Sequence, residues 1–345
     1  MDNFNFDLFK EICEVRAISG EERDLVSLLK RLYLENDVEI IYDNLGCMVA
    51  HKKCNKENAK KVLVLAHSDE IGFIVNSIEK NGIIKVSPVG GINPSTLLGD
   101  RVFLKNDEGK LFYGVISSST SHDKISDLEF DFGFDSKDEI INNNISIGNS
   151  IYLEGNTCKL NDKRVVSKAI DDRYGCFLTV ELLNSLKDVE LDVDLYVGVS
   201  VQEEVGCRGA QTITNKINPD FAIVLDCSPS DPKNKNGILG DGVLLRVKDA
   251  NMLAFKSLIN YQKEVCDKVG VPSQRFISMG GTDAGIIHKS YEGILTLTHC
   301  ICAKNLHTSS TIIDINDYLG AKKSLVYMIK DLNEEKIEGF KKENR

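Results

Sequence analysis

Two adjacent glutamates, Glu203 and Glu204, stand one residue beyond an apolar run that ends at Val201. A carboxylate at the end of a buried strand is costly unless a cation or a transferable proton compensates its charge. Because successive side chains of a strand point to opposite faces, the two carboxylates cannot meet one partner in the same way. We therefore predict a division of roles, in which one glutamate binds an ion and the other transfers protons.

Further polar residues stand where apolar runs end or where a helix is about to begin: His67, Asp171, Asp226 and His307. In open α/β sheets, ligands bind in the crevice beyond the carboxyl ends of the strands. We therefore expect these side chains to converge, although they are up to 240 positions apart. Two histidines combined with carboxylates suit a pair of zinc- or cobalt-like ions better than magnesium, which prefers oxygen ligands.

Each of these residues also has a simpler explanation when it is taken alone. A histidine at a strand end is more often a satisfied polar residue than a ligand, and adjacent aspartates such as Asp171 and Asp172 commonly form turns or cap helices. Five such positions in the right order along the chain favour a functional site. The other histidines do not share this placement, and we interpret them as surface or core residues: His51, His122, His288 and His299.

The elements that must position these residues alternate between strand and helix. Continuous apolar runs indicate strands buried on both faces of a sheet, and apolar residues at helical spacing indicate helices between them. We predict strands at 62–66, 191–201, 221–225 and 293–302, and helices at 175–186, 252–269 and 317–332. This alternation predicts an α/β fold with a mostly parallel central sheet flanked by helices.

Both ends of the chain carry more local signals. Ser19 and Glu22 have the spacing of a capping box at the start of a helix, and a turn at 43–46 separates two short predicted strands. The charged segment 334–345 is expected to fray.

The pattern changes between residues 72 and 164. Short alternating segments are separated by turn signals such as Asn81-Gly82 and Gly148-Asn149, a spacing typical of a small β-barrel. We therefore predict a catalytic α/β domain made of residues 1–71 and 165–345, with a β-rich domain inserted at 72–164.

Composition limits the partners and the compartment. The chain has 345 residues and a formal net charge of −10, which argues against a nucleic-acid surface. Its apolar runs are too short to span a membrane, and its first residues lack the pattern of a signal peptide. Ten cysteines are scattered along the chain, so we expect reduced thiols and a cytoplasmic protein without nucleic-acid or membrane partners.

Several motifs occur together and in order: 66–72, 168–175, 201–210, 280–285 and the region around His307. With them, the chain resembles the dinuclear metallo-aminopeptidases of the glutamyl, deblocking and tetrahedral (TET) aminopeptidase family. Members of that family often carry an endoglucanase or cellulase label. The resemblance covers nearly the whole chain, including the β-rich insertion.

The resemblance implies a zinc-exopeptidase-like fold, two divalent metal ions and a role for each candidate residue. The ions would be zinc or cobalt, with manganese as a further candidate. Asp171 would bridge both ions, Glu203 would be the general base, and Asp69 would orient a histidine ligand. The remaining ligands would complete the two sites, one with His67 and Asp226, the other with Glu204 and His307.

The implied activity is metal-dependent hydrolysis of N-terminal residues from short peptides. A metal-activated water would attack the scissile carbonyl, and one metal would hold the free α-amine of the substrate. The insertion would mediate dimers that assemble into a larger homo-oligomer such as a dodecamer.

The sequence departs from the family pattern close to the last ligand. Relatives carry Pro-x-Arg-Tyr-x-His-Ser-Pro where this chain has 302–309, so Lys304 replaces an arginine, and the segment 227–232 is also atypical. The substrate could carry an acidic side chain at its N-terminal residue, because three basic residues stand close to these motifs: Lys304, Arg173 and Arg208.

Two other functions stay open. An inactive relative that serves as a scaffold or peptide-binding protein would bind metal without turnover. A glycoside hydrolase would need two carboxylates about 5–9.5 Å apart and usually no metal, and the histidine ligands argue against it.

Overall fold

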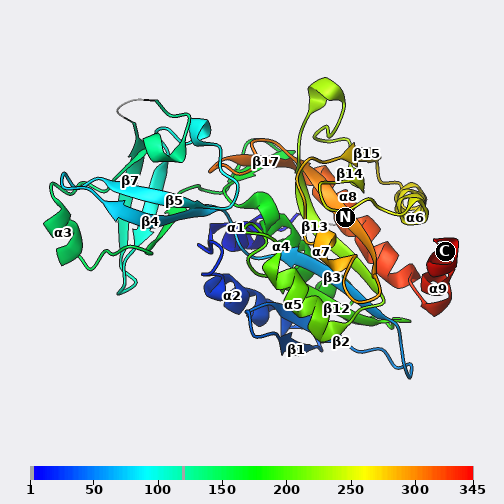
Figure 1. Ribbon diagram of the computed structural model, residues 1–345. Helices are drawn as coiled ribbons and strands as arrows, with labels where there is room; N and C mark the ends of the chain where they lie inside the picture. The colour runs from blue at the N-terminus through cyan, green and yellow to red at the C-terminus, as the bar shows by residue number, and fades with distance from the viewer. Residues whose placement is uncertain (1–3, 119–120, 345) are drawn as a thin grey trace.

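The computed structural model describes residues 4–118 and 121–344. Its main body contains one eight-stranded sheet, and a closed β-barrel projects from that body (Figure 1). In spatial order the strands of the sheet are β1 (Glu39–Tyr42), β2 (Met48–Lys52), β12 (Asp194–Ser200), β3 (Lys61–His67), β13 (Phe221–Pro229), β16 (Leu295–Ala303), β14 (Val243–Lys248) and β15 (Ser273–Ile277).

The centre of the sheet is parallel. Strands β12, β3, β13 and β16 run in the same direction, while β2 and β14 pair with this central group in the antiparallel sense. The carboxyl ends of the four central strands therefore meet at one edge of the sheet. The predicted α/β class with a mostly parallel sheet is confirmed.

Helices cover both faces of the sheet, which explains why the central strands are apolar throughout. Along β3, Val62 and Val64 belong to one hydrophobic core, whereas Leu63 and Leu65 belong to another. The first core includes residues of α1 (Phe6–Glu14), α2 (Arg23–Tyr33), α4 (Ile170–Ser185), α6 (Lys256–Lys268), α8 (Ile315–Asp331) and α9 (Glu334–Glu343). The second includes residues of α5 (Arg208–Ile217) and α7 (Ala284–Ile287).

The barrel has a hydrophobic core of its own, in which Phe73 packs edge-on against Phe130. It closes because its last strand pairs with its first. Around the barrel the strands are β4 (Gly72–Ile78), β5 (Ile84–Val89), β8 (Glu129–Asp131), β7 (Leu111–Ser117), β6 (Arg101–Lys105) and β9 (Ser150–Leu153). The same segment of chain contains the short helix α3 (Lys137–Asn142).

A small antiparallel sheet follows the barrel in the chain. It contains β10 (Cys158–Lys159), β11 (Arg164–Ser167) and β17 (Thr311–Asp314). Three 3-10 turns complete the described elements: η1 (Pro94–Thr96), η2 (Ile125–Asp127) and η3 (Pro232–Asn234). None of the helices in the described part of the chain combines the length and the apolar character that a membrane-spanning segment requires.

Two local predictions are wrong. The capping box does not form, because Ser19 donates its hydroxyl to Asp69 and Glu22 accepts the N–H groups of Gly20 and Gln202. Ser19 thereby serves the buried carboxylate of Asp69 after β3, and Glu22 joins its own loop to the loop after β12. A buried carboxylate needs such a partner more than an exposed helix end does. Residues 334–343 do not fray but form α9, because Ile337 and Phe340 lie on one face and are buried; Arg345 lies outside the described residues.

Candidate metal centre

The two histidines of the site are oriented in the same manner. Nδ1 of His67 lies 3.1 Å from the carbonyl oxygen of Asp69, and Nδ1 of His307 lies 2.6 Å from that of Gly91. A carbonyl at Nδ1 holds the proton there and leaves Nε2 as a donor for a metal ion. Both Nε2 atoms face Asp171, His67 at Oδ1 and His307 at Oδ2, each at 3.2 Å.

Asp171 and Asp172 open α4 with non-helical backbone angles, and a cis peptide bond joins them. Asp172 accepts the backbone N–H groups of His67 at 3.2 Å and Gly175 at 3.1 Å. It thereby fixes the start of α4 against the end of β3. Gly175 leaves room for this carboxylate, since a Cβ there would lie 2.3 Å from an Asp172 oxygen.

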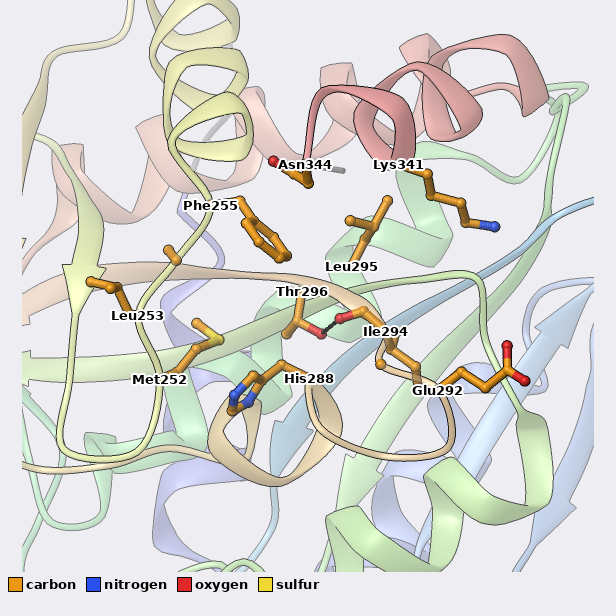
Figure 2. A pocket seen from close by; sticks show the side chains of 12 residues that line it. Met252, Leu253, Phe255, His288, Glu292, Ile294, Leu295, Thr296, Lys341 and Asn344 are labelled. Carbon is orange, nitrogen blue, oxygen red and sulfur yellow. Dashed lines mark hydrogen bonds between the residues drawn. The ribbon is translucent and has the colours of Figure 1, made fainter.

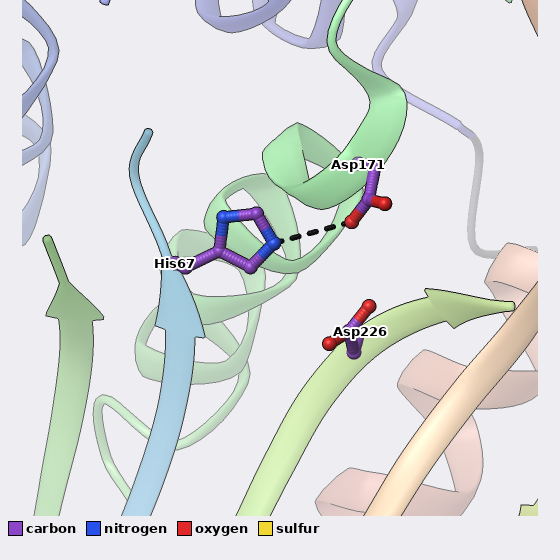
Figure 3. Close-up of side chains that lie close together, drawn as sticks. All are labelled: His67, Asp171 and Asp226. Atoms are coloured by element: carbon purple, nitrogen blue, oxygen red, sulfur yellow. Dashed lines mark hydrogen bonds and ion pairs between the residues drawn. The ribbon is translucent and has the colours of Figure 1, made fainter. Parts of the chain in front are cut away.

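The five residues predicted as metal ligands come together in two overlapping groups. In each group the potential ligand atoms lie within 4.8 Å of one another, and Asp171 belongs to both groups. The first group is His67, Asp171 and Asp226 (Figure 3), and the second is Asp171, Glu204 and His307. One imidazole nitrogen with two carboxylates in each group is a donor set that suits zinc, cobalt or manganese.

Asp69 contacts the histidine ring through its backbone carbonyl and the two glutamates through its carboxylate. Its carboxylate is 3.6 Å from Nδ1 of His67, so only the Asp69 carbonyl oxygen is within hydrogen-bond distance of that ring. The carboxylate accepts the backbone N–H groups of Glu203 and Glu204 at 2.9 and 3.0 Å. The loop after β12 is therefore attached to the end of β3 through one buried side chain.

The electrostatics of the site favour bound cations. Burial raises the pKa of Glu203 and Asp226 well above the usual range, and it raises the pKa of Glu204 to about 7. For His307, burial is outweighed by Glu204 and Asp171, which raise its pKa to about 10. Carboxylates outnumber imidazoles here, and divalent cations would compensate the excess negative charge.

A cavity of about 350 Å³ opens onto this cluster. All five predicted ligands and Glu203 line it, and so do Cys207, Arg246, Ser278 and Gly280. Its volume is sufficient for one terminal residue of a peptide.

The basic residue at the cavity is one that the sequence did not single out. The guanidinium of Arg246 is buried and donates to the Ser228 hydroxyl and the Gly280 carbonyl oxygen. Arg173 was expected as a candidate for an acidic substrate, but it is fully buried and donates to Ile12, Val15 and Glu70. Arg208 and Lys304 are exposed and do not line the cavity.

The barrel side of the chain contributes backbone to the site. Gly90 and Gly91 follow β5, and Gly91 supplies the carbonyl that orients His307. Gly90 has φ +87°, and a Cβ there would lie 2.7 Å from Ile71 and 3.2 Å from a Glu204 carboxylate oxygen. In the sequence, the Gly90-Gly91 pair indicates a turn. It does not indicate the spatial neighbours of that turn, Glu204 and His307, which are more than 100 residues away in the chain.

The remaining histidines lie outside the cluster. His51 stacks on Tyr196, His122 is exposed, and His299 is buried between Gln262 and Ala321. His288 lines a separate cavity of about 330 Å³ near the start of β16, the end of that strand remote from the metal centre (Figure 2). None of the five predicted ligands lines that second cavity.

The sequence profile of M42 glutamyl aminopeptidases matches residues 46–323. The chain belongs to this family. The M42 chain is 36% identical over 350 residues to the glutamyl aminopeptidase of Lactococcus lactis subsp. cremoris, with 97% of this chain and 99% of the relative covered.

Solved structures agree with this assignment. The TET aminopeptidase of a marine sediment archaeon, Thaumarchaeota archaeon SCGC AB-539-E09, superimposes with a TM-score of 0.92 at 29% identity, covering 97% of this chain and 99% of that one. The TET1 peptidase of Pyrococcus horikoshii, described as assembling into a tetrahedron or a large octahedral shell, gives 0.86 at 26% identity, covering 94% and 99%. The M42 chain is thus a peptide hydrolase of a metal-dependent aminopeptidase family.

Proposed function

We propose that this M42 chain removes single N-terminal residues from short peptides at a centre that holds two divalent ions. The observation that carries the proposal is the placement of Asp171, whose two oxygens each face the Nε2 atom of a different histidine at 3.2 Å. One short carboxylate with a histidine on either side suits a pair of ions that share a ligand. His67 and Asp226 would complete one site, and Glu204 and His307 the other.

Glu203 is the general base of this proposal. Two ions held by these ligands would lower the pKa of a water and polarise the scissile carbonyl. The Glu203 carboxylate borders the same cavity, and burial raises its pKa, so its proton affinity is higher than that of an exposed glutamate. It takes a proton from the water and passes it to the leaving amine. Asp69 positions Glu203 for this transfer by holding its backbone N–H.

The preference for a free N-terminus follows from the ions that the cavity would hold. Four carboxylates, from Asp171, Glu203, Glu204 and Asp226, line it together with two histidines. With two ions bound by these side chains, one ion would also take the free α-amine of the substrate as a ligand, and an acetylated end does not offer that ligand.

We propose zinc, cobalt or manganese as the ions, since histidine nitrogen is part of each ligand group. The test is hydrolysis of aminoacyl chromogenic substrates by enzyme reconstituted with each metal, across acidic, basic and apolar side chains. We expect turnover that EDTA abolishes and added metal restores, and none on N-acetylated substrates. Bound metal without turnover on the whole panel would favour a peptide-binding protein, and EDTA-insensitive cellulose hydrolysis would favour a glycosidase.

We also propose that the β-rich insertion, residues 72–164, mediates a homo-oligomer that builds up to a dodecamer. Exposed apolar side chains on β7, Tyr113 and Val115, support this role. Light scattering after size exclusion tests it, with Tyr113→Glu expected to lower the molecular mass.

A cytoplasmic location is supported by the cysteines, which are all unpaired and, except for Cys158, buried.

A further inference from the structure

A third group of potential ligand atoms lies beside the metal centre. Side-chain atoms of Glu203, Cys207 and Asp283 come within 4.8 Å of one another. Cys207 stands immediately before α5 and donates its thiol to Oε1 of Glu203 at 3.2 Å. Asp283 stands immediately before α7. Glu203 and Cys207 lie four residues apart in the loop between β12 and α5, and the fold brings Asp283 to them from a distant segment.

Asp283 has an unsatisfied oxygen at this position. Its side chain is buried, with 2% of its surface exposed, and Oδ2 accepts the Ser200 hydroxyl at 2.5 Å. Within residues 4–118 and 121–344, Oδ1 accepts no hydrogen bond. A buried carboxylate oxygen without a partner is costly, and such groups point to a ligand that satisfies them.

We propose that Glu203, Cys207 and Asp283 form a third, inhibitory cation site for a thiophilic divalent ion such as zinc or cadmium. A thiolate with two carboxylates is a donor set that zinc accepts and that magnesium and calcium do not favour. The site is reached from outside, because Glu203 and Cys207 both line the cavity over the metal centre.

Binding at this site replaces a proton by a metal ion. Burial, Asp283 and Glu203 raise the pKa of the Cys207 thiol, so sulfur holds its proton while the site is empty. When the ion binds, a metal–sulfur bond forms and the thiol proton leaves to water. The two carboxylates and the thiolate together offset the charge of the cation.

The inhibitory effect rests on the proposed role of Glu203. Its carboxylate cannot accept a proton from water while it binds a cation, so hydrolysis stops as the third site fills. The same metal would therefore support turnover at two ions per chain and suppress it in excess.

The experiment is a cadmium titration of enzyme that already holds two zinc ions per chain. Cadmium–thiolate absorption in the ultraviolet reports the site directly, and chromogenic peptide hydrolysis is followed in parallel. The test variant is Cys207→Ser, which keeps a hydrogen-bond donor for Glu203. The matched control is Cys266→Ser, a buried thiol on α6 outside the cluster. Each variant is compared with its own rate at two zinc ions.

In wild type and Cys266→Ser we expect the absorption to rise with one equivalent of cadmium and hydrolysis to fall about 100-fold, the scale of losing a general base. Cys207→Ser should show neither change, and Asp283→Asn should bind cadmium more weakly. Equal absorption or equal inhibition in Cys207→Ser would overturn the proposal, as would absorption without inhibition. Because absorption needs no turnover, an enzyme inactive at two zinc ions would contradict the proposed function without hiding the third site.

Discussion

The carboxylate of Asp69 accepts the backbone N–H of Glu203 at 2.9 Å. Its other oxygen accepts the next N–H, that of Glu204, at 3.0 Å. Asp69, two residues after the end of β3, thus fixes the positions of the proposed base and of a proposed ligand. Asp69 acts through the His67 ring and through the backbone of the two glutamates, so it is a positioning residue.

Asp69→Asn tests this arrangement. An amide offers one accepting oxygen, and its NH₂ group would face a backbone N–H, so the loop carrying the two glutamates has to shift. Outer-shell partners of this kind typically contribute about 10–100-fold to activity or metal affinity. We expect kcat to fall by about that factor with KM less affected. Asp43→Asn is the matched control, because Asp43 also accepts backbone N–H groups, in the turn before Cys47. Equal losses in both variants would contradict a special role for Asp69.

Gly90 connects the barrel to the metal centre, and its replacement should affect metal binding. In Gly90→Ala the new methyl group meets Ile71 at 2.7 Å and the Glu204 carboxylate at 3.2 Å. We expect weaker binding of the ion held by Glu204 and His307, measured by isothermal titration of the apoenzyme. Gly99→Ala is the control, since Gly99 has nearly the same φ, +88°, but no atom within 4 Å of the added carbon. A similar loss in Gly99→Ala would assign the effect to backbone strain alone.

We predict that His299 makes the free energy of unfolding depend on pH independently of the metal centre. Burial lowers its pKa from 6.5 to about 4. The unfolded chain therefore binds more protons between these values, so the free energy of unfolding falls as pH drops from 6.5 towards 4. The full difference is on the order of 3 kcal/mol. Denaturant titrations from pH 7 to pH 4 should show a smaller decrease for His299→Gln than for wild type. The exposed His122→Gln should follow wild type, and parallel curves for all three would contradict the prediction.

The central features of the site were predictable from sequence because they depend on strand ends. His67 ends a parallel strand, and Glu203 and Glu204 follow a neighbouring one, so the sheet itself brings them to one edge. The contacts of Asp69, Gly91 and Asp283 were not predictable in the same way. Their partners are backbone groups or side chains on loops whose paths depend on packing between the barrel and the sheet. Ser19 and Glu22 illustrate the reverse case, where a local capping signal yields to buried tertiary partners.

The prediction that the C-terminal segment frays was wrong for a different reason. Its high charge indicated a frayed end, but Ile337 and Phe340 are spaced to share one helical face, and Phe340 packs against Tyr261. Two apolar residues in a charged segment do not predict a packed helix unless the surface against which they pack is known.

The division of roles between the adjacent glutamates is the claim on which the account depends. Turnover and metal content should be measured together for wild type, Glu203→Gln and Glu204→Gln. We expect Glu203→Gln to retain two ions per chain while kcat falls by about 100-fold or more, because only proton transfer is lost. Glu204→Gln should lose the ion shared with His307. Turnover of Glu203→Gln within a few-fold of wild type, or equal loss of metal in both variants, would contradict the account.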